Sequence, residues 1–213
     1  MARGGPVALF GASGRTGRAV VAAAAARGVA IRALYRAAGT DVPREVIPVV
    51  GSLRDREAVR QTLEGCHAVA CVFGPNQRQP EVFCAEATAL IMSVMAELGV
   101  ARLVCQTGAM IGEGAGCRSR PMEWFARRFA ASRPDLAADR SEHERLVMES
   151  GLDWLIVKPP RLTDGTRRRA LISGPEIRVG MLSSVRRADL AELLVSELAG
   201  PDHHRGRIFV RSR

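Results

Sequence analysis

The chain has 213 residues, of which 47% are hydrophobic and 25% are charged, a balance typical of one globular α/β domain. No apolar run approaches the roughly 20 residues that a membrane span needs, so we expect no membrane partner. Residues 1–6 lead directly into an apolar segment and leave no room for a signal peptide, which favours a cytoplasmic protein.

The net charge of +9 raises the question of a nucleic-acid partner. Arginines supply nearly all of it, since Lys158 is the single lysine, and they are spread along the chain apart from the run 167–169. Aromatic residues are only 4%, whereas nucleic-acid binders concentrate charge on one face and interleave it with aromatics. We expect a solvated arginine-rich surface and no nucleic-acid partner, with some of the charge attracting an anionic small molecule.

The five cysteines are odd in number and have no CxxC spacing. Most lie in apolar segments, where a free thiol behaves as a small hydrophobe, so neither a disulfide framework nor a metal site is expected. Cys117 follows a glycine-rich loop and is the cysteine that we expect to be exposed and reactive.

Strand-like apolar runs alternate with helix-period segments along the chain. The predicted strands are 6–10, 29–35, 46–50, 68–73, 102–107, 154–157 and 207–210. The predicted helices are 15–27, 54–63, 81–98, one or two helices within 122–150, and 189–198. Repeated β-α units with apolar strands predict a Rossmann-type α/β fold: a doubly wound parallel sheet in a single domain, 1–213.

The first strand runs into Gly11-Ala-Ser-Gly-Arg-Thr-Gly17, which has the spacing G-x-x-G-x-x-G. Glycines there permit a tight turn and let the backbone approach a pyrophosphate, and the helix N-terminus offers N–H groups and partial positive charge. A structural turn is the alternative, but a strand before the loop and a helix after it favour a dinucleotide site.

The end of the second predicted strand bears on the choice between NAD and NADP. An NAD site usually carries an acid about 20 residues after the loop, and this chain has Leu34-Tyr35-Arg36 there. An arginine can pair with a 2′-phosphate, a contact worth roughly 1.5–3 kcal/mol, or about a ten- to hundred-fold preference. Arg36, helped by Arg15, therefore favours NADP(H), although an exposed surface arginine is the alternative.

Several motifs follow one another at intervals that resemble those of one protein family. They are the glycine loop, Arg36, Gly51, Phe73-Gly74 and Ser150-Gly-Leu-Asp-Trp-Leu-Ile-Val-Lys-Pro159. The family is that of the atypical short-chain dehydrogenase/reductases of the NAD(P)H-binding, NmrA-like group. Within it, the chain resembles the flavin reductases, also called biliverdin-IXβ reductases, over nearly its full length.

The resemblance implies a role for each matching position. The phosphates would be held by Gly11, Ser13, Gly14, Arg15, Thr16 and Gly17, and the 2′-phosphate by Arg36. Gly51 and Ser52 would lie beside the adenine, where the family usually has Gly-Asp, and Gly74 would pass under the ribose. Thr107 and Gly108 would lie near the nicotinamide, and Pro159 with Pro160 would form a wall of its pocket. For each glycine and proline, a purely structural role as a turn or strand terminator is the alternative to direct contact.

The proton donor typical of the wider superfamily is missing. The positions of the superfamily's catalytic tyrosine and lysine are occupied in this chain by Leu136 and Arg140. The single tyrosine of the chain, Tyr35, lies instead at the end of the second predicted strand. Hydride transfer to a stacked flavin or quinone tolerates this loss, because solvent can supply the proton. Candidate catalytic residues are Thr107 as a hydroxyl donor, Arg140 as an anion partner and His143 as a proton donor, although a histidine among helix charges is more often a solvated surface residue.

The sequence therefore predicts an NADPH-dependent oxidoreductase that transfers hydride to a flat acceptor such as a flavin, a quinone or an aromatic natural-product intermediate. A small C-terminal region would cover this small-molecule substrate. Two alternatives stay open: an NADP(H)-binding redox sensor without catalysis, and a non-redox tailoring enzyme on the same fold.

Overall fold

The computed structural model describes residues 4–37, 42–74, 82–112, 114, 116–165 and 170–213. The arginine run 167–169 lies outside them. The strands are β1 (Val7–Phe10), β2 (Ile31–Tyr35), β3 (Val46–Val50), β4 (Ala68–Cys71), β5 (Arg102–Gln106), β6 (Asp153–Lys158), β7 (Arg161–Thr163), β8 (Leu171–Gly174), β9 (Ser184–Arg186) and β10 (Gly206–Ser212). The helices are α1 (Arg15–Ala26), α2 (Arg56–Leu63), α3 (Cys84–Leu98), α4 (Arg120–Ser132), α5 (Pro134–Glu149) and α6 (Arg187–Ala199).

Eight strands form one sheet in the order β3-β2-β1-β4-β5-β6-β10-β8. Every neighbouring pair is parallel except β10 and β8, which are antiparallel at the edge. The order reverses beside β1, which is the switch point of a doubly wound sheet. The predicted Rossmann-type α/β fold in a single domain is confirmed.

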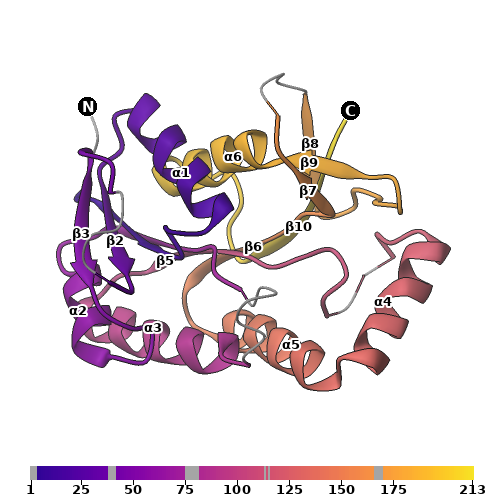
Figure 1. Cartoon of the computed structure of the whole chain (residues 1–213), viewed down its shortest axis with the longest axis horizontal. Coiled ribbons are helices and arrows are strands. Elements are labelled where there is room, and N and C mark those ends of the chain that lie inside the picture. Colours follow the sequence, from indigo (N-terminus) through magenta and orange to yellow (C-terminus); the bar gives the residue numbers. More distant parts are fainter. Residues whose placement is uncertain (1–3, 38–41, 75–81, 113, 115, 166–169) are drawn as a thin grey trace.

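Helices cover both faces of the sheet, with α1 and α6 on one face and α2, α3 and α5 on the other (Figure 1). Each face has its own apolar core, and the strands β1 and β4 are buried throughout because they are covered on both sides. The alanine-rich α1 packs its buried small side chains against α6, which allows the two helices to lie close together.

Three short strands, β7, β8 and β9, were not predicted from the sequence. β7 pairs in parallel with β9 in a separate two-stranded sheet, and β8 pairs with the C-terminal β10. These strands have three or four residues and only partial burial, so neither their length nor their periodicity stands out in the sequence.

The environment of Cys117 and the lengths of the helices bear on two further predictions. Cys117 is only 3% exposed and its Sγ lies 3.1 Å from the carbonyl oxygen of Pro175, so the prediction of an exposed, reactive thiol is wrong. The loop glycines before Cys117 do not prevent it from packing in a small core with Met122, Val179 and Phe209. Within the described part of the chain, every helix is too short or too polar to span a membrane.

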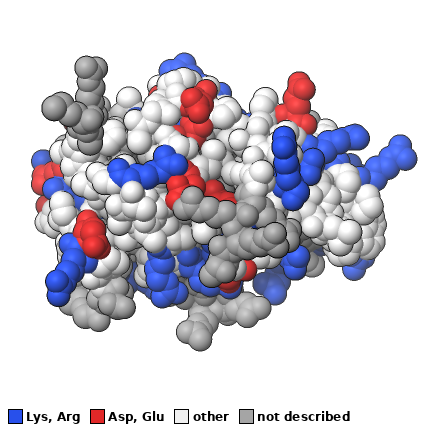
Figure 2. Space-filling model, turned by 90° about the horizontal axis from the view of Figure 1, so that it is seen from above, with Lys and Arg blue, Asp and Glu red and all other residues white. Residues whose placement is uncertain are grey.

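The charges are dispersed. On the face seen in Figure 2, the basic side chains lie in several separate groups, with acidic side chains and uncharged surface between them. Many arginines are paired with carboxylates, as in Arg56–Glu97 and Arg145–Glu142.

Candidate functional site

A groove of about 1270 Å³ lies at the carboxyl ends of the parallel strands, beside the switch point between β1 and β4. This is where open α/β sheets bind their ligands. Its walls come from the glycine loop after β1, the ends of β2, β3, β4 and β5, and the helices α4 and α5.

The glycine loop forms a tight turn that brings α1 against β1. A Cβ on Gly17 would lie 2.1 Å from the Gly11 carbonyl oxygen, so only glycine permits this approach. The helix begins at Arg15 after Gly14, without a side-chain cap and without an acidic residue in its first turn. Its first N–H groups and the positive end of its dipole therefore suit a bound phosphate.

Arginine is the dominant charge in the groove. Six arginines line it, and no Asp or Glu does so among the described residues. They are Arg15, Arg18, Arg36, Arg54, Arg140 and Arg187. Such a lining fits a ligand with several phosphates, because partial desolvation in a cleft strengthens each attraction.

Arg140 is the buried member of this set, with 7% exposure. Its Nη1 donates to the Phe73 carbonyl oxygen at 3.2 Å and lies 3.3 Å from Cys84 Sγ. A Cβ on Gly74 would lie 3.2 Å from the same Nη1, so the guanidinium is immediately below the chain that ends β4. No carboxylate contacts it within the described residues, which leaves a fixed positive charge at the floor of the groove.

Two uncharged polar residues, Gln106 at the end of β5 and Thr107 after it, line the groove. Buried Oγ1 of Thr107 and buried Oε1 of Gln106 have no hydrogen-bond partner among the described residues. Buried polar atoms are normally satisfied, so both oxygens are suited to a ligand or ordered water. Gln106 was not singled out from the sequence, although its position at a strand end next to Thr107 is a usable signal.

Most of the predicted cofactor positions line this groove. They are Gly11, Ser13, Gly14, Arg15, Thr16, Arg36, Gly51, Ser52, Gly74 and Thr107. Leu136 and Arg140, which the family resemblance equates with the missing tyrosine and lysine, line it as well. The structure thus brings together residues that are far apart in the sequence.

The remaining predicted positions do not line the groove. Gly17 and Gly108 lie next to lining residues, and the Pro159 carbonyl oxygen accepts from Ala109 N–H at 2.8 Å. Pro159 is buried and Pro160 half-buried. Their roles in holding a cofactor stay predictions.

His143 is fully buried, so the interpretation as a solvated surface residue is wrong. It lies on the inner face of α5, where its Nδ1 is 3.1 Å from the buried Oγ1 of Thr88 on α3. Its ring packs near Phe73, with ring centroids 6.1 Å apart. Since His143 does not line the groove, it is not placed to protonate a ligand there directly.

An acidic residue connects the two sides of the groove mouth. Asp164, just after β7, accepts from Arg187 Nη1 at 2.7 Å and lies 3.4 Å from Nη1 of Arg15 in the glycine loop. The pairs join the C-terminal part of the chain to the start of α1. The predicted covering role of that part stays a prediction.

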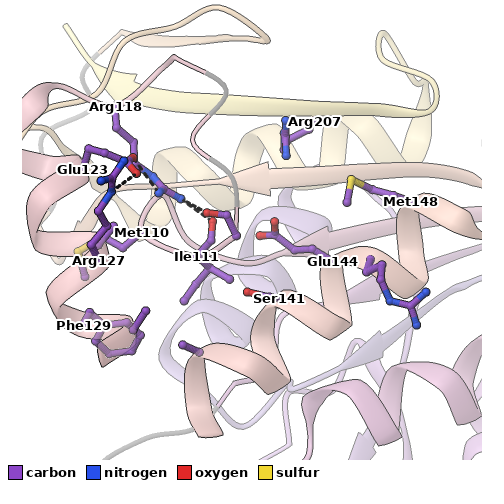
Figure 3. Close-up of a pocket in the computed structure, with 15 residues that line it drawn as sticks. Met110, Ile111, Arg118, Glu123, Arg127, Phe129, Ser141, Glu144, Met148 and Arg207 are labelled. Carbon is purple, nitrogen blue, oxygen red and sulfur yellow. Dashed lines mark hydrogen bonds and ion pairs between the residues drawn. The ribbon is translucent and has the colours of Figure 1, made fainter. Parts of the chain in front are cut away.

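A second cavity, which we call the lateral cavity, lies between α4, α5 and the first residues of β10 (Figure 3). It has a volume of about 530 Å³ and shares Ile111 and Phe129 with the groove. Arg118, 8% exposed, fixes the loop beside it by donating to the carbonyl oxygens of Ala109, Ile111 and Gly112.

A buried ion pair lies at the inner wall of the lateral cavity. Lys158 Nζ is 2.5 and 2.7 Å from the two carboxylate oxygens of Glu144 and 2.7 Å from the Ile111 carbonyl oxygen. Burial lowers the pKa of Lys158 to about 8, against the attraction of Glu144. Sequence reasoning missed this pair, although a single lysine at the end of an apolar strand signals a buried partner.

A family model described as NAD(P)H-binding matches residues 11–201. This span contains the glycine loop and every arginine of the groove.

Solved structures share the fold at low identity. An anaerobillin reductase, ChuY, from Escherichia coli O157:H7 superposes with a TM-score of 0.80 at 20% identity, covering 97% of each chain. A short-chain dehydrogenase/reductase from Veillonella parvula in complex with NADP gives 0.80 at 16% identity, covering 99% of this chain and 95% of that one. A protein described as exported from Burkholderia pseudomallei gives 0.77 at 21% identity, covering 97% and 99%.

Proposed function

The chain belongs to the NAD(P)H-binding family, and from this premise we propose that it is an NADPH-dependent oxidoreductase that reduces a flat acceptor such as a flavin, a quinone or an aromatic natural-product intermediate. The observation that carries the proposal is the composition of the groove. Arginine is its only ionisable side-chain type among the described residues, so it offers anion binding without a proton donor that titrates near neutral pH.

The preference for NADPH over NADH rests on Arg36. It follows β2 and lines the groove together with Gly51, Ser52 and Arg54, and no acidic side chain lines this region in the described residues. An NAD site would place a carboxylate on the ribose hydroxyls here, whereas a 2′-phosphate needs cations. The structurally similar short-chain dehydrogenase/reductase from Veillonella parvula, which was solved in complex with NADP, supports this preference.

The acceptor would lie where the groove becomes apolar. The part of the groove formed by α4, α5, β7 and the loop after β5 is lined by Ile111, Phe129, Leu136 and Leu162. Bound NADPH supplies the hydride. The buried guanidinium of Arg140 stabilises the negative charge that develops on the acceptor, and solvent delivers the proton.

The proposal is tested by following NADPH absorbance in the presence of FMN, a naphthoquinone and a simple aliphatic ketone. We expect sustained turnover with the flavin or the quinone and none with the ketone, because ketone reduction needs a positioned acid. Tight NADPH binding without turnover on any acceptor would contradict the proposal and favour the redox sensor. Turnover of a bound substrate without net NADPH oxidation would favour the non-redox alternative.

Cofactor choice is tested by Arg36→Ala. We expect the ratio of NADPH to NADH efficiency to fall about ten- to hundred-fold, because one charge-assisted contact to the 2′-phosphate is lost while NADH binding is unaffected. Arg60→Ala, on the exposed face of α2, is the matched control and leaves the ratio unchanged. An unchanged ratio in Arg36→Ala would remove the basis of the NADPH assignment.

A further inference from the structure

The lateral cavity has features of a ligand site that the dinucleotide does not use. Residues of α4 and α5 form most of its lining, and residues of the glycine loop and α1 do not line it. Figure 1 shows α5 and α1 on opposite faces of the sheet. Its volume of about 530 Å³ falls within the roughly 300–1,000 Å³ typical of small-molecule sites. Apolar side chains form much of its wall, among them Met110, Ala126, Phe129, Ala137 and Met148.

Most charged side chains around this cavity already have partners. Arg118 is held by three carbonyl oxygens and by Glu123, which also contacts Arg127. Arg145 pairs with Glu142 and Glu149. Arg118 and Arg145 are therefore held at the walls by several contacts each, whereas Arg127 is largely exposed to solvent.

The carboxylate of Glu144 is likewise engaged, by Lys158. Gly112 adjoins it closely: its φ is +54°, and a Cβ there would lie 2.5 Å from Glu144 Oε2. The wall around the ion pair therefore depends on a glycine at position 112. The negative charge of Glu144 does not repel an incoming anion strongly, because the Lys158 ammonium neutralises that charge.

Arg207 is the exception. It stands on β10 at the wall of the cavity opposite Glu144 (Figure 3), half-buried, and no acidic side chain of the described residues pairs with it. Burial is the main cause of the lowered pKa of Lys158, and the positive charges of Arg118 and Arg207 add to it. A partly desolvated guanidinium beside an apolar chamber favours a ligand that combines an acidic group with an apolar body.

We propose that the lateral cavity binds an amphipathic organic anion, with its carboxylate or sulfonate on Arg207 and its aromatic or aliphatic body against Phe129, Ala137 and Met148. The site adjoins the groove but lies outside the part lined by the glycine loop, so it can be filled while the dinucleotide is bound. Because Ile111 and Phe129 belong to both cavities, the anion lies next to the part of the groove that we assign to the acceptor.

The probe for the test is anilinonaphthalene sulfonate, titrated by fluorescence in the presence of saturating NADP⁺. NADP⁺ fills the dinucleotide part of the groove, and the variants at Arg207 and Ala137, which line only the lateral cavity, distinguish probe bound there from probe bound in the acceptor part. We expect saturable binding that Arg207→Gln weakens about ten-fold or more and that Arg211→Gln, on the same strand but outside the cavity, leaves unchanged. N-phenylnaphthylamine, which has the rings but no acid, should bind weakly and respond to neither change.

A second variant tests the apolar wall. Ala137→Trp fills the cavity from α5 and should abolish probe binding while NADP⁺ affinity and Tm stay near those of the unaltered protein. Displacement of all the probe by NADP⁺, or equal probe affinity in Arg207→Gln and Arg211→Gln, would overturn the proposal. These readouts need no turnover, so failure of the reductase proposal would leave them intact and interpretable.

Discussion

At the scale of single residues, the ion pair of Lys158 and Glu144 shows how a charge is accommodated in the core. Lys158 has no measurable exposure, and its ammonium keeps three acceptors, two from Glu144 and one from Ile111. Removing one partner of a buried pair costs about 3–5 kcal/mol, whereas replacing both by apolar groups is often neutral. The pair is therefore a strong constraint on the sequence even where it adds little net stability.

The lowered pKa of Lys158 predicts a pH dependence of stability. Between the folded value of about 8 and the ordinary value of 10.5, the unfolded chain binds more protons than the folded chain, so the free energy of unfolding rises with pH across this window. Relative to the double variant Lys158→Met/Glu144→Gln, we expect a gain of up to about 3 kcal/mol from pH 8 to pH 10.5 in urea titrations. A difference that is constant or falls with pH would refute this.

At the scale of elements, α3 depends on α5 for its first turn. Phe83 at the N-cap has no side-chain cap to offer, and Asp139 of α5 instead accepts from the N–H groups of Cys84 at 3.0 Å and Ala85 at 2.9 Å. This cap comes from 54 residues further along the chain. It fixes α5 against α3 just below the groove, since Arg140 is the next residue.

Asp139→Ala should lower the free energy of unfolding by about 1–3 kcal/mol, because one buried and one part-buried N–H group lose a charged acceptor. Chemical denaturation measures the loss, and Asp139→Asn, which keeps one oxygen acceptor, should recover part of it. If Asp139→Ala were no less stable than Asp139→Asn, the cap would have no energetic role.

At the scale of the whole molecule, one sheet joins the two cores, so the cores should unfold together. We expect urea transitions followed by far-ultraviolet circular dichroism and by tryptophan fluorescence to coincide. NADP⁺ at one hundred times its Kd should add about 2.7 kcal/mol, because it binds only the folded chain. Two separate transitions, or no stabilisation by NADP⁺, would contradict a single cofactor-binding unit.

The strands and helices that carry the fold could be predicted because their pattern is local. Buried β1 and β4 are continuous apolar runs, and α1 follows a glycine loop whose spacing has one well-known use. The boundaries were less certain: the predicted helix 81–98 begins at Cys84, and the segment 122–150 divides at Pro134, which cannot continue the preceding helix. The short β7, β8 and β9 depend on partners far away in the chain.

The amino-acid sequence by itself therefore determined the fold class, the NAD(P)H-binding family and the place of the glycine loop between β1 and α1, because glycine spacing and hydrophobic period are properties of neighbouring residues. Only the tertiary structure decided which arginines share the groove, that His143 is buried against Thr88, and that Arg207 faces a cavity without a described acidic partner. Burial and pairing depend on which distant segments pack together, and a sequence pattern does not contain that information.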